Sequence, residues 1–152
     1  MAKDETPQEE PNTAAKLDTA GKIEWLNTFG WGEDQLEDLR VTGYAYIRQG
    51  KYSIALPLFE ALNVLDPTNA YDAQTMGALL VQVGNPAKAL RYLDKALKLE
   101  PKHGPTLVNL AKAFLMLGNK KEGLKLARII KKERKREPSI RSLAEALLLA
   151  FS

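Results

Sequence analysis

The chain has 152 residues, with 22 Lys and Arg residues against 19 Asp and Glu residues and a net charge of +3. Its 45% hydrophobic and 27% charged residues are typical of one soluble globular domain. Cysteine is absent, which excludes a disulfide framework, a thiolate nucleophile and a cysteine-ligated zinc site. No apolar run approaches the roughly 20 residues of a membrane-spanning helix and no export signal is recognisable. We therefore expect a cytoplasmic protein without direct membrane insertion.

The N-terminal part of the chain is acidic. Residues 1–36 hold eight acidic residues against three lysines. Residues 1–15 also contain two prolines and many polar residues, so we expect a disordered acidic head. Residues 16–32 are expected to form a helix followed by a linker, because Gly30 and Gly32 interrupt the helical pattern. The apolar residues of this segment that need cover are Ile23, Trp25, Leu26 and Trp31.

An internal repeat organises the middle of the chain. Leu65-Asp66-Pro67 recurs as Leu99-Glu100-Pro101 at a spacing of 34 residues, which is the period of the tetratricopeptide repeat, or TPR. The small residues Gly43, Gly77 and Ala111 recur at the same interval, where two helices must cross closely. We therefore predict an all-α fold in which a TPR helical array of three helix-turn-helix repeats spans residues 33–137. It follows the N-terminal helix and ends in a C-terminal capping helix within residues 138–152.

The prolines and glycines that punctuate the repeat set the expected helix boundaries. Glycine favours the left-handed backbone that ends a first helix, and Pro67 and Pro101 follow the end of each second helix. The expected helix pairs are 33–49 with 52–65, 69–83 with 86–99, and 104–117 with 120–135. A last helix is expected over residues 138–149, where an apolar stripe would cover the open end of the stack.

A stack of such helix pairs curves, and the first helix of each pair lines its concave face. Recurring positions on these helices, with two neighbouring residues, give a candidate groove for a peptide. Its apolar members would form side-chain pockets, Gln74 and Asn109 would bind a peptide backbone, and Arg40 and Lys112 would meet acidic groups of a partner. Tyr44 and Tyr71 have an alternative role, which is to fill the core between helices. The candidate groove residues are Arg40, Tyr44, Ile47, Tyr52, Tyr71, Gln74, Ala78, Val81, Val108, Asn109, Lys112 and Leu115.

Other chemistry has little support in this sequence. His103 is the only histidine and follows Pro101 at a turn, so we expect an exposed turn residue and no metal site. No catalytic residue set and no glycine-rich phosphate loop is present, so we expect neither an enzyme nor a cofactor. Residues 120–136 hold nine basic residues against two acidic ones, but no aromatic residues are interleaved to stack bases. We interpret this run as a solvated helix face and expect no nucleic-acid partner.

Several segments resemble the small TPR chaperones of bacterial type III secretion systems that guard the translocator, or pore-forming, subunits. The resemblance runs from about Gly21 to the end of the third repeat. It is carried by four segments, in one of which Leu62 replaces the usual alanine of the repeat. Arg40 and Ile47 stand where this family has aromatic residues. The segments are Gly21-Lys22-Ile23-Glu24-Trp25-Leu26-Asn27, Leu36-Glu37-Asp38-Leu39, Gly50-Lys51-Tyr52 and Phe59-Glu60-Ala61-Leu62-Asn63-Val64-Leu65-Asp66.

The resemblance implies a cytoplasmic bacterial chaperone that binds an extended apolar segment of secreted translocator proteins, or of another secreted polypeptide. It also implies a homodimer formed through Ile23, Trp25, Leu26 and Trp31. Packing of these residues on the first repeat is the alternative. Two other functions stay open. One is the TPR subunit of a needle-protein chaperone, and the other is a general TPR scaffold for protein–protein interaction.

Overall fold

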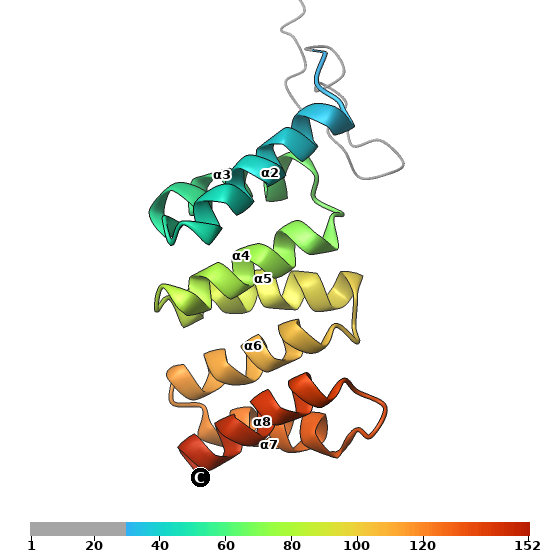
Figure 1. Ribbon diagram of the computed structural model, residues 1–152. Helices are drawn as coiled ribbons and strands as arrows, with labels where there is room; N and C mark the ends of the chain where they lie inside the picture. Colours follow the sequence, from blue (N-terminus) through green and yellow to red (C-terminus); the bar gives the residue numbers. More distant parts are fainter. Residues whose placement is uncertain (1–29) are drawn as a thin grey trace, which may run out of the picture.

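The computed structural model describes residues 30–152, and the expectations for the acidic head, the N-terminal helix, Ile23, Trp25 and Leu26 lie outside this part of the chain. Within residues 30–152 the secondary structure consists of α-helices joined by short turns (Figure 1). Their bounds are α2 (Glu33–Arg48), α3 (Tyr52–Leu65), α4 (Ala70–Gln82), α5 (Pro86–Leu99), α6 (Gly104–Met116), α7 (Lys120–Lys132) and α8 (Pro138–Phe151).

The helices stack in pairs along the chain. The first helix of each repeat packs on the second, α2 on α3, α4 on α5 and α6 on α7, and α8 packs on both α7 and α6 (Figure 1). This arrangement confirms the predicted all-α TPR array. The observed bounds follow the expected ones closely, except that α7 ends at Lys132 rather than at residue 135. The backbone leaves the helical conformation at Glu133 (φ −74°, ψ 96°), and further basic residues on a longer α7 would repel one another.

Close helix crossings explain the small residues of the repeat. A methyl group added to Gly43 would lie 2.6 Å from the Phe59 ring, and one added to Gly77 would lie 2.5 Å from a Leu93 methyl carbon. Both distances are shorter than carbon atoms can approach. The third repeat has Ala111 at this position, and that residue is fully buried. At each of these positions the two helices of a repeat therefore pack too closely for a larger side chain.

The turns inside the repeats depend on glycines with a left-handed backbone. Gly50, Gly84 and Gly118 have φ values of 71°, 81° and 81°, which suit a residue without Cβ. After Gly84 the chain enters α5 through Asn85, whose side-chain oxygen accepts a hydrogen bond from the Lys88 backbone N–H. These local signals place the two helices of a repeat antiparallel with only a few residues between them.

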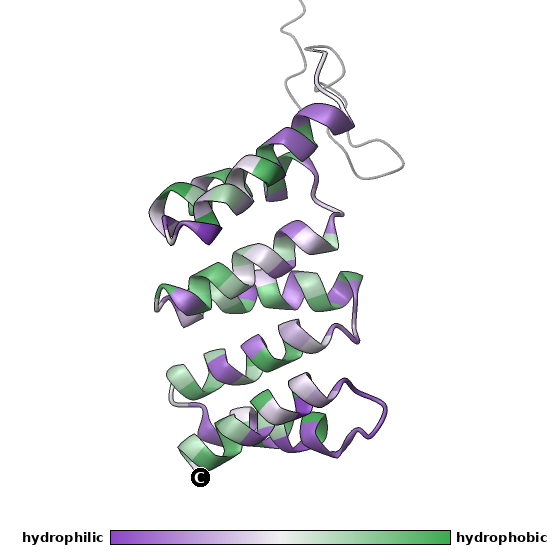
Figure 2. Cartoon of the chain, viewed as in Figure 1, coloured by the Kyte–Doolittle hydropathy of each residue, from purple (hydrophilic) through white to green (hydrophobic). Residues whose placement is uncertain are grey.

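Two clusters of buried side chains form the core. The larger joins the first two repeats around Phe59, Leu80 and Leu93. The smaller joins α6, α7 and α8 around Ile130 and Ile140. Figure 2 shows hydrophilic residues at the start of α2 and in the loop between α7 and α8. None of the helices within residues 30–152 has both the length and the apolar character needed to cross a bilayer.

Candidate peptide-binding groove

A hollow of about 490 Å³ lies between the three repeats. Its size is within the range of small-molecule and peptide-side-chain pockets. We call it the groove. The first repeat contributes aromatic and aliphatic side chains, α4 lies in the middle, and the start of α6 with its N-cap residue supplies the third side. The groove is lined by Tyr44, Ile47, Tyr52, Tyr71, Gln74, Thr75, Ala78, Leu79, Gln82, His103, Pro105, Thr106 and Asn109.

Tyr44 and Tyr71 join the first repeat to the second in this groove. Their ring centroids are 5.3 Å apart with the planes inclined by 36°, and Tyr44 also contacts Phe59 edge-to-face at 5.3 Å. The Thr75 hydroxyl donates to the Tyr71 carbonyl at 2.8 Å, which uses its single proton. The Tyr44 hydroxyl therefore donates to Thr75 Oγ1 at 2.7 Å. Burial raises the pKa of Tyr44 and keeps the phenol neutral.

Tyr71 differs from Tyr44 in its exposure. Tyr44 is half-buried, whereas Tyr71 keeps 51% of its surface exposed. Tyr44 thus fills the space between repeats and also lines the groove, which combines the two roles considered for it. Tyr71 offers most of one ring face to any ligand that enters.

Arg40 lies beneath the groove in a buried ion cluster. Its Nε donates to Asp72 Oδ1 at 2.8 Å, and its Nη2 donates to Asp72 Oδ2 and to Asp66 Oδ2, each at 2.7 Å. Asp72 is fully buried and Arg40 is 6% exposed. The hydrogen bond to Asp72, together with the Asp66 carboxylate, raises the pKa of the Arg40 guanidinium above its usual value. The Arg40 charge is matched within the chain, which differs from the expectation that it would meet acidic groups of a partner.

A second polar contact fixes the middle of the groove. Gln74 is 9% exposed and donates from Nε2 to Glu100 Oε2 at 2.9 Å, which connects α4 to the end of α5. Its side chain lines the groove but already has a partner. By contrast, no side-chain hydrogen bond is found for Gln82 or Asn109 within residues 30–152. These two amides are therefore among the polar groups on the groove wall with spare hydrogen-bonding capacity.

The structure brings together seven of the twelve candidate groove residues and separates the other five. The seven that line the groove are Tyr44, Ile47, Tyr52, Tyr71, Gln74, Ala78 and Asn109. Besides Arg40, three are core residues: Val81, Val108 and Leu115 are 3%, 8% and 6% exposed. Lys112 is exposed on α6 but does not line the groove. Trp31 is 37% exposed before α2, with Gly30 on one side and Gly32 on the other.

Three of the displaced residues, Val81, Val108 and Leu115, share a physical cause. Each packs into the core instead of facing the groove. Leu115, for example, lies against Gly123, where an added methyl would be 2.7 Å from the Leu115 Cγ. Val108 packs in the cluster with Ile130 and Ile140. A repeat template places these positions on the concave side on average, but it carries no information on how far each one is buried.

Sequence reasoning missed several groove residues. Thr75, Leu79 and Gln82 lie on α4 beside residues that were expected, and they follow from helical spacing once Tyr71 and Ala78 are placed. His103 and Thr106 are different, because they belong to the turn that begins α6. The signal that could have found them is the N-cap position of His103, which the helix start at Gly104 defines.

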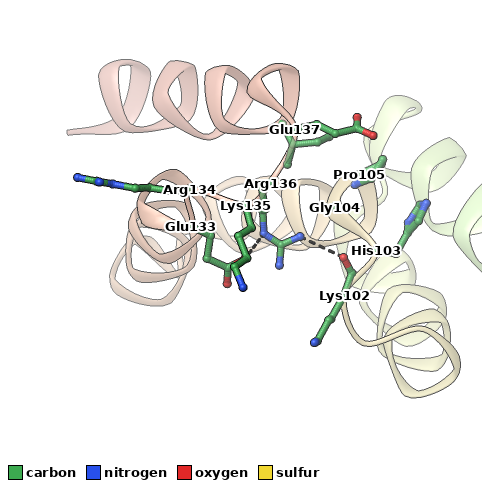
Figure 3. A pocket seen from close by; sticks show the side chains of 10 residues that line it. Lys102, His103, Gly104, Pro105, Glu133, Arg134, Lys135, Arg136 and Glu137 are labelled. Carbon is green, nitrogen blue, oxygen red and sulfur yellow. Dashed lines mark hydrogen bonds and ion pairs between the residues drawn. The ribbon is translucent and has the colours of Figure 1, made fainter.

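A larger hollow of about 840 Å³ lies between the turn before α6 and the α7–α8 loop. Figure 3 shows Arg134 extending away from Arg136, while dashed lines join Arg136 to Glu133 and to Lys102. Arg136 pairs with Glu133 and donates to the Lys102 carbonyl at 3.0 Å. This contact connects the α7–α8 loop to the turn before α6. We therefore interpret the hollow as a structural junction between these two segments, and we call it the joint. Among the described residues, no cluster of His, Asp or Glu side chains could hold a metal ion.

The helix pairs, their 34-residue period and the groove between them define a tetratricopeptide-repeat array. Residues 80–147 match the family model of the tetratricopeptide repeat. No curated protein matches the sequence. Solved structures give a more specific likeness, and it is to chaperones of type III secretion translocators.

The structure of PcrH, a Pseudomonas aeruginosa protein, in complex with the chaperone-binding region of PopD superposes with a TM-score of 0.70. The two chains are 26% identical, over 80% of this chain and 94% of that one. The translocator chaperone SycD of Yersinia enterocolitica has a TM-score of 0.70 at 20% identity, covering 82% and 96% of the two chains. A type III secretion complex from Aeromonas hydrophila has a TM-score of 0.73 at 21% identity, covering 87% and 89%. The last two show the fold alone.

Proposed function

We propose that this chain is a chaperone that binds an extended apolar segment of a type III secretion translocator protein in the groove. The observation that carries this proposal is the groove itself. Three tyrosines, Ile47 and Ala78 surround one hollow, and amide side chains lie beside them. The likeness to PcrH, whose complex holds the chaperone-binding region of PopD, supports the choice of client.

The mechanism needs only burial of apolar surface. A translocator subunit exposes apolar segments before it reaches a membrane, and these segments aggregate in water. Each aliphatic side chain that the groove buries contributes about 1.5–3 kcal/mol. A dissociation constant on the order of micromolar corresponds to about 8 kcal/mol, so it takes several such anchors, because part of their contribution offsets the cost of ordering the segment. A cytoplasmic site of action and release by the secretion machinery fit this mechanism, which uses no nucleotide.

The electrostatics of the groove disfavour the general scaffold. A TPR scaffold that binds a C-terminal carboxylate needs cationic side chains on the groove wall. Arg40 is committed to Asp66 and Asp72 beneath the groove, and Lys112 lies outside it. No Lys or Arg side chain from residues 30–152 lines the groove. Such a groove favours an uncharged segment over a free carboxylate.

The test is isothermal titration calorimetry, in which the purified chain is titrated with a synthetic peptide of the PopD chaperone-binding region. We expect micromolar binding and a negative heat-capacity change from apolar burial. A control peptide with its aliphatic anchors replaced by serine should not bind. PcrH serves as the positive control in the same assay. If PcrH binds the PopD peptide while this chain binds neither it nor a YopD peptide, the proposal fails.

A further inference from the structure

His103 holds an unexpected position at the start of α6. It is the only histidine of the chain, and the structure makes it the N-cap residue of this helix. Its side chain is half-buried and lines both the groove and the joint beside the α7–α8 loop. This placement differs from the expectation of an exposed turn residue, because the ring folds back to cap the helix.

The capping contact determines which nitrogen carries the ring proton. The Thr106 backbone N–H donates to His103 Nδ1 at 3.3 Å, and Thr106 Oγ1 lies 2.6 Å from the same nitrogen. A backbone N–H can only donate, so Nδ1 must present its lone pair. In the neutral imidazole the proton therefore resides on Nε2, which becomes a hydrogen-bond donor.

The donor side of the ring has no partner among residues 30–152, and the His103 side chain lines the groove. Figure 3 shows the His103 ring turned away from the Arg136 guanidinium. No acceptor for Nε2 is found among residues 30–152, since the hydrogen bonds of this side chain all use Nδ1. Asn109, one helical turn beyond Thr106, lies on the same wall. The wall that the first repeat supplies is instead aromatic and aliphatic. It consists of Tyr44, Ile47 and Tyr52.

We propose that His103 donates a hydrogen bond from Nε2 to a main-chain carbonyl of the bound client segment and so sets the position of that segment in the groove. This inference rests on the proposed function. An extended segment carries a carbonyl on every residue, and its side chains alternate between two sides. With its backbone against His103 and Asn109, such a segment directs alternate side chains toward the apolar wall of the first repeat. A neutral donor suits an uncharged carbonyl in a groove that holds no Lys or Arg side chain of residues 30–152.

The first test needs no client. Because the chain has one histidine, ¹⁵N labelling of histidine gives a single pair of ring-nitrogen signals. In long-range ¹H–¹⁵N spectra at about pH 8, we expect a non-protonated Nδ1 and a protonated Nε2. A proton on Nδ1 instead would overturn the assignment of the donor.

The second test adds the PopD chaperone-binding peptide to the same labelled protein. We expect the Nε2 proton to shift downfield and to exchange more slowly with solvent when the peptide is bound. Binding without any change at Nε2 would overturn the donor role and leave the proposed function intact. Absence of binding would remove the proposed function and the donor role together, so the two failures are distinguishable.

A substitution separates capping from binding. His103→Asn retains a side chain that caps helices well but is too short to offer a donor to the groove. We expect an unchanged midpoint of thermal unfolding. The affinity for the PopD peptide should fall 3- to 10-fold, which is about the contribution of one hydrogen bond. Asn85→Ala is the matched control, because it removes the cap of α5 at a residue outside the groove. It should lower the unfolding midpoint and leave peptide affinity unchanged. Full affinity in His103→Asn would overturn the proposal.

Discussion

Arg40 and Asp72 lie 32 residues apart and form a two-point ion pair, with Nε to Oδ1 at 2.8 Å and Nη2 to Oδ2 at 2.7 Å. The pair joins α2 to α4 next to the contact between Tyr44 and Tyr71, with Arg40 one turn before Tyr44 and Asp72 directly after Tyr71. Only the planar guanidinium can bind both carboxylate oxygens at once. The pair therefore contributes, with the larger core cluster, to the contact between the first two repeats.

Replacement of Arg40 by methionine should destabilise the fold strongly. Methionine retains most of the apolar stem but leaves Asp72, which is fully buried, without its counter-charge. Breaking a buried ion pair from one side costs about 3–5 kcal/mol. We expect a loss of that size in the free energy of unfolding, measured by urea denaturation. The double change Arg40→Met with Asp72→Asn should recover part of it, because the unpaired charge is then removed.

Glu37 gives the control for this experiment. Its carboxylate lies 3.5 Å from Arg40 Nη1, but its side chain is 66% exposed. Exposed ion pairs contribute roughly 0–1 kcal/mol. Glu37→Gln should therefore leave the unfolding curve nearly unchanged. A similar loss in Glu37→Gln and Arg40→Met would contradict the assignment of the stability to the buried pair.

Gly77 should tolerate no side chain. A methyl group there would lie 2.5 Å from Leu93 Cδ2 and 2.9 Å from Leu93 Cγ, and Leu93 is fully buried. Overpacking a core costs about 1–3 kcal/mol, which exceeds the gain of about 0.5–1 kcal/mol that alanine gives within a helix. We expect Gly77→Ala to lower the free energy of unfolding, measured by urea denaturation, although alanine is the better helix former.

The double variant Gly77→Ala with Leu93→Ala tests the cause. The smaller side chain makes room for the added methyl, so the two losses should be less than additive. Gln82→Ala, on the exposed end of α4, is the control and should change stability by less than about 0.5 kcal/mol. Additive losses at Gly77 and Leu93 would show that the close crossing is not the reason for the glycine.

The sequence was sufficient for the fold because the fold is repetitive and its signals are local. The spacing of Pro67 and Pro101, the left-handed turn glycines and the small crossing residues each constrain a few neighbouring residues, and repetition adds these constraints up. The end of α7 was the exception. Its basic pattern continues helically past Lys132, but the backbone leaves the helical conformation at Glu133 (φ −74°, ψ 96°).

The groove was harder to predict because it depends on how deeply each side chain is buried. Val81 has the repeat position of a groove residue but packs in the core at 3% exposure. Arg40 appears as an available cation until Asp66 and Asp72 are placed beside it, and those residues come from another turn and another helix. His103 enters the groove only because its ring caps α6. The cases of Val81 and Arg40 involve contacts between segments distant in sequence, which a single-sequence pattern does not encode. The His103 cap is local, but the groove that its side chain lines is formed with residues of the first two repeats.

Tyr44 gives a prediction for alkaline pH. Burial raises its pKa, so the folded state favours the neutral phenol more than the unfolded chain does. The associated stability is complete below about pH 10, the ordinary tyrosine pKa, and is lost as the pH rises through the raised value. In a titration of tyrosinate absorbance, we expect the signal of Tyr44 to appear above the range of ordinary tyrosines, until unfolding releases it.

Tyr44→Phe identifies that signal among the five tyrosines of the chain. The variant should remove the late-titrating component and leave the others in place. It also leaves Thr75 Oγ1 without its donor, which should cost about 0.5–1.5 kcal/mol of stability at neutral pH. If the late component persists in Tyr44→Phe, another tyrosine is responsible and the raised pKa does not belong to Tyr44.

Substitutions at Tyr71 and Val81 distinguish effects on binding from effects on folding. The repeat pattern places both residues in the groove, but in the structure Val81 lies in the core. Tyr71→Ser removes a ring that is 51% exposed, so we expect a change of less than about 1 kcal/mol in stability and at least a tenfold loss of PopD peptide affinity. Val81→Ala removes two buried methyl groups and should cost about 1–3 kcal/mol of stability. At a temperature where the variant stays folded, its peptide affinity should remain within about twofold of the parent, since Val81 does not line the groove. The reverse pattern, with binding lost in Val81→Ala and kept in Tyr71→Ser, would place the client on a different surface of the array.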